Sequence, residues 1–188
     1  WKSRDRVSQG ATPGKGAMAS AQEVVESILK IKAEGNEAYQ KKDFVRAVEI
    51  YSRGVKLLPD LDDASDAGLK RLTPELLQQG AVLLCNRSAA YMGEKKAVAA
   101  LADAQLAADY DSTNWKAHWR TGLAFMMMEP RLERSEKAVA AFEAALLCAS
   151  LPASERDNVV RALDAAQYRL REGRDSLDMP NMDGCSIS

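Results

Sequence analysis

Histidine and cysteine are scarce in this chain of 188 residues. A single histidine argues against catalysis by a histidine acid or base. The cysteines are odd in number and widely spaced, which argues against a disulfide framework and favours a reducing compartment: Cys85, Cys148 and Cys185. No C-x-x-C pair or Cys/His cluster supplies zinc ligands. We therefore expect neither a disulfide scaffold nor a metal site.

Long apolar runs and an excess of one charge are also missing. No stretch of eighteen apolar residues is present, so we expect no membrane insertion. The 26 basic and 27 acidic residues give a net charge of −1, which creates no general attraction to nucleic acid. There is no glycine-rich phosphate loop, and no paired carboxylates mark a catalytic pocket. We predict a non-enzymatic, cytoplasmic and monomeric protein that needs no cofactor and binds no nucleic acid.

Alanine is abundant, with 31 residues, and runs of β-branched residues are absent. Alanine is the best helix former, and its small side chain lets helices approach closely. Ser20 and Glu23 form a capping box, Asp43 can cap a second helix, and Thr73-Pro74 marks a third helix start. Apolar periodicity predicts an all-α protein with helices at about 20–41, 43–59, 73–93, 96–109, 113–128, 135–149 and 154–173.

The chain divides into a helical region and two tails. Residues 1–19 are rich in Gly and Ser and have no apolar period, so we interpret them as a flexible tail, partly vector-derived, with Met18 as the native start. We place the helical domain at 20–176 and a second tail at 177–188. The acidic stretch at 60–66 is expected to be a solvated loop.

Three segments of the helical region repeat one pattern. They begin near Ile28, Ala81 and Trp115, so the second and third lie 34 residues apart, and the first lies 53 before the second. Four sets of matched positions recur in the two helices of each segment. Three sets contain only small residues: Gly35, Ser88 and Gly122; Ala47, Ala100 and Ala138; Gly54, Ala107 and Ala145. The fourth set contains two aromatic residues: Tyr51, Ala104 and Phe142.

This pattern resembles the tetratricopeptide repeat (TPR), a 34-residue unit of two antiparallel helices. The alternative is an unrelated helical bundle with small residues at its contacts. The resemblance implies a right-handed superhelix of three helix pairs, closed by a C-terminal capping helix. In that last helix we expect Val159, Val160, Leu163 and Tyr168 to face inward, and Arg161, Arg169, Arg171 and Arg174 to face outward.

Polar residues recur on the first helices, which line the concave face of such a superhelix. The sequence reads K-A-E-G-N at 32–36, N-R-S-A-A at 86–90 and K-A-H-W-R at 116–120. These motifs match those of TPR domains that grip the two carboxylates of a C-terminal aspartate. The resemblance implies a carboxylate clamp made of five residues: Lys32, Asn36, Asn86, Lys116 and Arg120.

By the same resemblance, the partner is the extreme C-terminal tail of heat shock protein 90 or heat shock protein 70, which ends in Glu-Glu-Val-Asp. The protein would then be a co-chaperone that tethers the chaperone to another activity. We expect four residues to line the groove beside the clamp: Tyr39, Met92, Trp119 and Met126. The alternative is a repeat scaffold that binds an internal peptide or a folded partner and needs no free C-terminus.

Overall fold

The computed structural model describes residues 20–58 and 73–178, with side chains as far as Gly173. The predicted tail at 1–19, the acidic stretch at 60–66 and residues 179–188 lie outside this part of the chain. All regular structure within it is helical: α1 (Ala21–Gln40), α2 (Phe44–Val55), α4 (Pro74–Gly93), α5 (Ala97–Tyr110), α6 (Trp115–Met127), α7 (Leu132–Leu147) and α8 (Ala153–Asp178). The predicted all-α fold class is confirmed.

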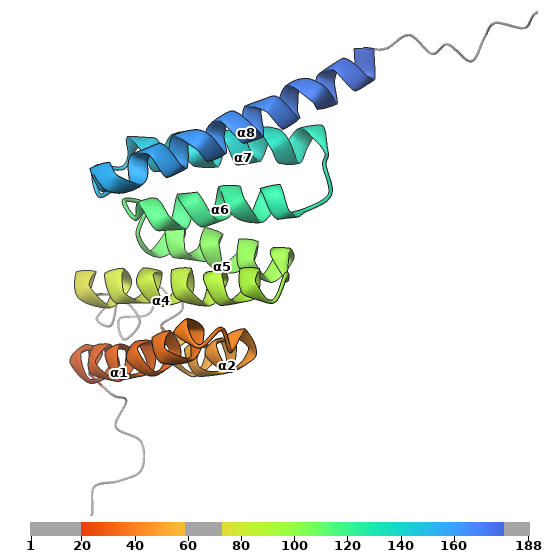
Figure 1. Cartoon of the computed structure of the whole chain (residues 1–188). Helices are drawn as coiled ribbons and strands as arrows, with labels where there is room; N and C mark the ends of the chain where they lie inside the picture. Colours follow the sequence, from red (N-terminus) through yellow and green to blue (C-terminus); the bar gives the residue numbers. More distant parts are fainter. Residues whose placement is uncertain (1–19, 59–72, 179–188) are drawn as a thin grey trace, which may run out of the picture.

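The helices form a stack of three pairs closed by α8 (Figure 1). Each helix contacts its neighbour along the chain, so α1 pairs with α2, α4 with α5, and α6 with α7. The first helices of the pairs also touch one another in order, α1 against α4 and α4 against α6. Because of this second set of contacts, α1, α4 and α6 form one layer and present side chains to a common face.

The helices of the first and third pairs meet where a small residue opposes a ring. A Cβ added at Gly35 would overlap the ring of Tyr51, and one at Gly122 would overlap the ring of Phe142. The matched positions of the second pair hold small residues on both helices. Ser88 and Ala104 are fully buried, and the Ser88 hydroxyl donates to the carbonyl oxygen of Ala100 at 2.7 Å. The outer pairs therefore reach close contact through a glycine beside a ring, and the middle pair has small buried residues on both of its helices.

The core consists of three consecutive clusters between the stacked pairs. One joins α1, α2 and α4 around Ile28 and Tyr51. The next joins α4, α5 and α6 around Leu84 and Tyr110. The last joins α6, α7 and α8 around Phe142. Since no pair buries its apolar faces alone, the stack is the unit that folds.

Capping side chains mark the predicted helix starts, and the first two pairs share one type of turn between their helices. Ser20 and Glu23 form the capping box, and the side chains of Asp43 and Thr73 accept from backbone N–H groups. Lys42 and Lys95 both have φ of 60°. They occupy the same place in the turns that join α1 to α2 and α4 to α5, so the first two repeats reverse direction in the same way.

The terminal helix α8 covers the last pair, as predicted, but its inner face differs from the prediction. Val159 and Ala166 are fully buried, whereas Val160 and Tyr168 are exposed. Arg169 points inward, where its guanidinium donates to the carbonyl oxygens of Met126 at 2.8 Å and Met128 at 2.7 Å. The prediction assumed that arginines face solvent, but these carbonyls at the end of α6 need donors. The helix also continues past Gly173, where the sequence suggested its end.

Gly122→Ala should destabilise the protein by about 1–3 kcal/mol, because the new Cβ collides with Phe142. The double variant Gly122→Ala/Phe142→Ala should cost less than the sum of the single variants, since removing the ring makes room for the Cβ. Urea unfolding measures all three. Ser88→Ala is the control, because this site already holds a Cβ and loses only one hydrogen bond. Additive costs would contradict the size argument.

Candidate functional site

The five residues of the predicted clamp lie on the layer formed by α1, α4 and α6. Lys32 and Asn36 lie on α1, Asn86 lies on α4, and Lys116 and Arg120 lie on α6. Within each helix the paired residues are four positions apart and therefore share a face. The layer brings residues that are up to 88 positions apart in the sequence to one side of the molecule.

Two asparagines join α1 to α4 at the centre of this set. Asn86 donates from Nδ2 to Oδ1 of Asn36 at 3.1 Å. The same oxygen accepts from the hydroxyl of Tyr51 at 2.8 Å. A carboxamide oxygen has two lone pairs, and these two hydrogen bonds occupy both of them. The NH2 group of Asn36 can therefore donate to a ligand.

Lys32 is held by a neutral partner. Its Nζ donates to Oε1 of Gln79 at 2.9 Å, and Gln79 lies on α4 two turns before Asn86. An amide oxygen fixes the position of the ammonium group without cancelling its charge. Lys32 therefore remains a full positive charge beside the asparagine pair.

Arg120 is the most unusual residue of the set. Its Nε is buried and has no hydrogen-bond partner among the described residues. Burial lowers the pKa of its guanidinium, and Cys85, Tyr39 and Tyr51 oppose this only in part. An arginine nevertheless stays charged at neutral pH. The site thus contains a desolvated cation that no carboxylate neutralises.

Lys116 is exposed at the start of α6, and its Nζ lies 5.8 Å from the ring centroid of Trp115. The positive charges of Lys116 and Arg120 both favour the thiolate of Cys85 and oppose the rise of its pKa, so both cations are near this thiol. Cys85 precedes Asn86 directly. The second cation of α6 therefore lies near the same part of α4 as the first.

Some of the other cations in the described part of the chain form ion pairs with acids, whereas these three do not. In the described part of the chain, five ion pairs involve Arg46, Arg53, Arg87, Lys96 and Lys137, and none involves Lys32, Lys116 or Arg120. Arg87 can be compared with Arg120, because both side chains are half-buried. Its side chain is 15% exposed, and it binds both carboxylate oxygens of Asp103, at 2.7 and 2.6 Å.

The four predicted groove residues have different surroundings. Tyr39 is exposed, with its ring edge-on to Phe44 at 5.4 Å, and Met92 is half-buried. Trp119 and Met126 are half-buried and pack against the cluster of α6, α7 and α8. Tyr39 is among the groups that oppose the lowering of the Arg120 pKa, so Tyr39 lies near the clamp. The lining role of all four stays a prediction.

Sequence reasoning missed two residues of this site. Gln79 lies seven positions before Asn86 and so shares its helix face, but its partner Lys32 is on another helix. Tyr51 aligns with Phe142, so the sequence predicts only a packing role for it. Its hydroxyl, which Phe142 lacks, was the available signal of an added role.

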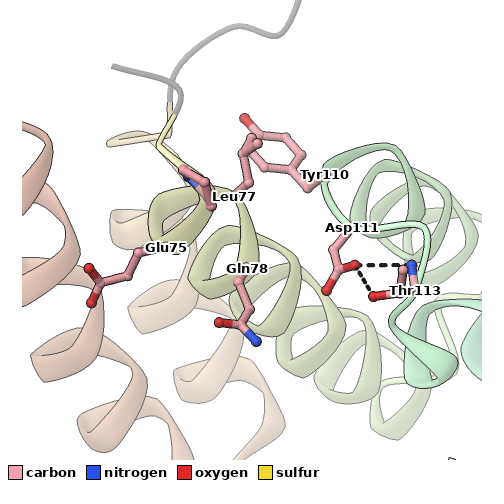
Figure 2. Close-up of a pocket in the computed structure, with 7 residues that line it drawn as sticks. Glu75, Leu77, Gln78, Tyr110, Asp111 and Thr113 are labelled. Carbon is pink, nitrogen blue, oxygen red and sulfur yellow. Dashed lines mark hydrogen bonds between the residues drawn. The ribbon is translucent and has the colours of Figure 1, made fainter. Parts of the chain in front are cut away.

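An open depression of about 530 Å³ lies beside this site, at the edge formed by the start of α4 and the turn after α5. Figure 2 shows Glu75 and Gln78 on α4 across from Tyr110 and Asp111. The Asp111 carboxylate accepts from the backbone N–H and the hydroxyl of Thr113, at 3.0 and 2.7 Å. A smaller adjoining depression shares Gln78 and Asp111 and extends to Lys116. The edge next to the clamp is therefore acidic.

The remaining candidate groups do not assemble into a reactive or metal-binding site among the described residues. Burial raises the pKa of the Cys85 thiol to about 11, so it is protonated at neutral pH. The imidazole Nε2 of His118 lies 2.9 Å from the carbonyl oxygen of Ser112. No group of three or more His, Cys, Asp or Glu side chains is placed to hold a metal. None of these helices combines the length and apolar character that a membrane span requires.

No protein-family model matches the sequence. Protein unc-45 homolog B of Xenopus laevis is 32% identical over 132 residues, which is 70% of this chain. The chain spans only 12% of the length of that relative.

Solved TPR domains share the architecture. The C-terminal TPR domain of a Plasmodium falciparum FK506-binding protein covers 84% of this chain and 97% of its own, at 20% identity and a TM-score of 0.65. The first TPR domain of Spaghetti (RPAP3), bound to the HSP90 peptide SRMEEVD, covers 85% and 98%, at 22% identity and 0.53. The second TPR domain of human RPAP3, in complex with the HSP70 peptide SGPTIEEVD, covers 79% and 98%, at 24% identity and 0.55. The described residues thus have the TPR fold.

Arg87 and Arg120 are both half-buried but differ in their partners, which predicts different effects of their removal on stability. Arg87→Met should cost about 3–5 kcal/mol, because it leaves Asp103 buried without its partner. Arg120→Met should change the free energy of unfolding by less than about 1 kcal/mol or increase it, because it removes an uncompensated charge. Urea unfolding of the ligand-free protein measures both. Equal destabilisation by the two variants would show that Arg120 is a structural residue.

Proposed function

We propose that this TPR domain binds the C-terminal tail of heat shock protein 90 or heat shock protein 70 through the free carboxylate and the acidic side chains of an EEVD sequence. It acts as a non-enzymatic co-chaperone module in the cytosol and tethers the chaperone to another activity. The observation that carries the proposal is the cluster of three cations without acidic partners around a pair of amide donors.

The chemistry of a C-terminal aspartate fits these groups. Such a residue presents two carboxylates a few ångströms apart, and charged donors form their strongest hydrogen bonds with carboxylates. The guanidinium of Arg120 offers a planar fork to one carboxylate, while Lys32 and Lys116 offer point charges. The amides of Asn36 and Asn86 donate without adding to the repulsion among the cations.

The expected affinity is moderate. Each charge-assisted hydrogen bond contributes about 1.5–3 kcal/mol gross. The peptide loses conformational freedom on binding, which offsets much of this gain. A net free energy of about −8 kcal/mol corresponds to a micromolar dissociation constant.

The charges around the clamp favour one direction for the peptide. Glu75 and Asp111 line the depression that reaches Lys116, and their carboxylates repel the two glutamates of the tail. Tyr39 and Met92 lie toward the other end of α1 and α4, where the surface offers aromatic and thioether groups. We therefore orient the residues before the glutamates toward Tyr39 and Met92.

The peptides in the two RPAP3 structures support the choice of ligand. Although one comes from HSP90 and the other from HSP70, both end in EEVD. The alternative is a scaffold that binds an internal peptide or a folded partner. The two differ in one property, since only the clamp requires the free carboxylate.

Calorimetry with a peptide that ends in Met-Glu-Glu-Val-Asp tests this requirement. The free acid should bind with micromolar affinity, and the amidated peptide should bind at least about tenfold more weakly, because it lacks one of the two carboxylates. Lys32→Ala and Arg120→Met should each weaken binding of the free acid by about tenfold or more. Lys30→Ala is the matched control, since Lys30 is an exposed cation on the same helix. Equal binding of the acid and the amide would favour the scaffold.

The affinity should also fall with ionic strength, because Lys116 is exposed and its contact with the ligand is screened. Between about 0.05 M and 0.5 M salt we expect the dissociation constant to rise by at least about threefold. Lys116→Ala should reduce this dependence. An affinity that does not change with salt would indicate an apolar binding surface instead of the clamp.

A further inference from the structure

Tyr51 does more than packing requires. It lies on α2, in the pair with α1, and its ring fills the space left by Gly35. Phe142 fills the same space beside Gly122 in the third repeat without a hydroxyl. A phenylalanine would thus meet the packing need of the first repeat, and the hydroxyl of Tyr51 calls for a separate explanation.

The hydroxyl donates to Oδ1 of Asn36 at 2.8 Å, the oxygen that also accepts from Asn86 at 3.1 Å. Oxygen and nitrogen of a carboxamide are nearly equal in size, so only hydrogen bonds decide which way the group faces. Two donors aimed at one side of Asn36 hold its oxygen there. The NH2 group is then turned to the opposite side.

The reversed orientation would harm an anion site. It would present the oxygen of Asn36 to a carboxylate and turn its NH2 group toward the donors of Tyr51 and Asn86. Without the hydroxyl, only Asn86 opposes this flip, and the Asn86 amide can itself turn. Burial raises the pKa of Tyr51 to about 12, so its hydroxyl stays protonated and able to donate at physiological pH.

We propose that Tyr51 is a positioning residue of the site: its hydroxyl fixes the carboxamide of Asn36 with the NH2 group available to a ligand carboxylate. This inference rests on the proposed function, because it concerns the same ligand. Tyr51 acts from behind Asn36 and belongs to none of the helices that carry the clamp residues.

Tyr51→Phe tests the inference, since it keeps the ring and removes the donor. Calorimetry with the free-acid Met-Glu-Glu-Val-Asp peptide should show about fivefold weaker binding, as expected for one neutral hydrogen bond. In an Asn36→Ala background, the same substitution should leave the affinity unchanged, because the group it orients is gone. Tyr91→Phe is the control, because the ring of Tyr91 lies under Arg87 on α4 and its hydroxyl has no hydrogen bond to any of the described residues.

Three outcomes separate the two proposals. If the wild-type protein does not bind the peptide, the proposed function fails. If the wild type binds and Tyr51→Phe binds equally well, the proposed function stands and the positioning role is overturned. If Tyr51→Phe weakens binding as much with Asn36→Ala as without it, Tyr51 does not act through Asn36.

A measurement without peptide covers the case in which the variant is less stable. The two side-chain N–H protons of Asn36 should give one sharp pair of NMR signals in the wild type and broadened or doubled signals in Tyr51→Phe. Unfolding in urea shows whether the variant is folded under these conditions. Unchanged Asn36 signals in the folded variant would overturn the inference.

Discussion

The two helices of each pair approach so closely that a Cβ added at Gly35 or Gly122 would overlap a ring of the partner helix. In the outer pairs a glycine lies against a ring, and in the middle pair the matched positions hold the small buried residues Ser88 and Ala104. This spacing sets how far α1, α4 and α6 stand from their second helices. The same three helices also contact one another and form the layer that carries the site. The position of this layer therefore depends on the contacts that each of its helices makes with the second helix of its pair.

The site inherits its geometry from this layer. Asn36 and Asn86 are 50 residues apart, yet their side chains bond directly because α1 and α4 touch. Tyr51 contributes to both the packing and the site, since its ring packs against Gly35 in the first pair and its hydroxyl donates a hydrogen bond to Asn36. Packing and recognition therefore meet in one side chain. Such coupling explains why the polar residues of the site lie next to the tightest contact of the first repeat.

The sequence was sufficient to predict the elements and the repeat, because both depend on local spacing. Helix caps at Ser20, Asp43 and Thr73 and the matched small residues could be read from neighbouring positions. Contacts between helices could not. The bond from Lys32 to Gln79 joins residues 47 positions apart, and the inward turn of Arg169 depends on carbonyl groups at the end of α6. A hydrophobicity pattern does not encode which carbonyls lack donors.

The charge of the site depends on which partners its cations lack. Lys96 is an exposed cation paired with an acid, Glu94 at 3.0 Å, and Arg87 is a less exposed one paired with Asp103. A glutamate in place of Gln79 would hold Lys32 equally well but would cancel its charge before a ligand arrived. Arg120 bears the desolvation of a buried cation without any such compensation. In the proposed complex, the peptide carboxylate supplies that compensation, so the desolvation of Arg120 in the empty protein is offset when the ligand binds.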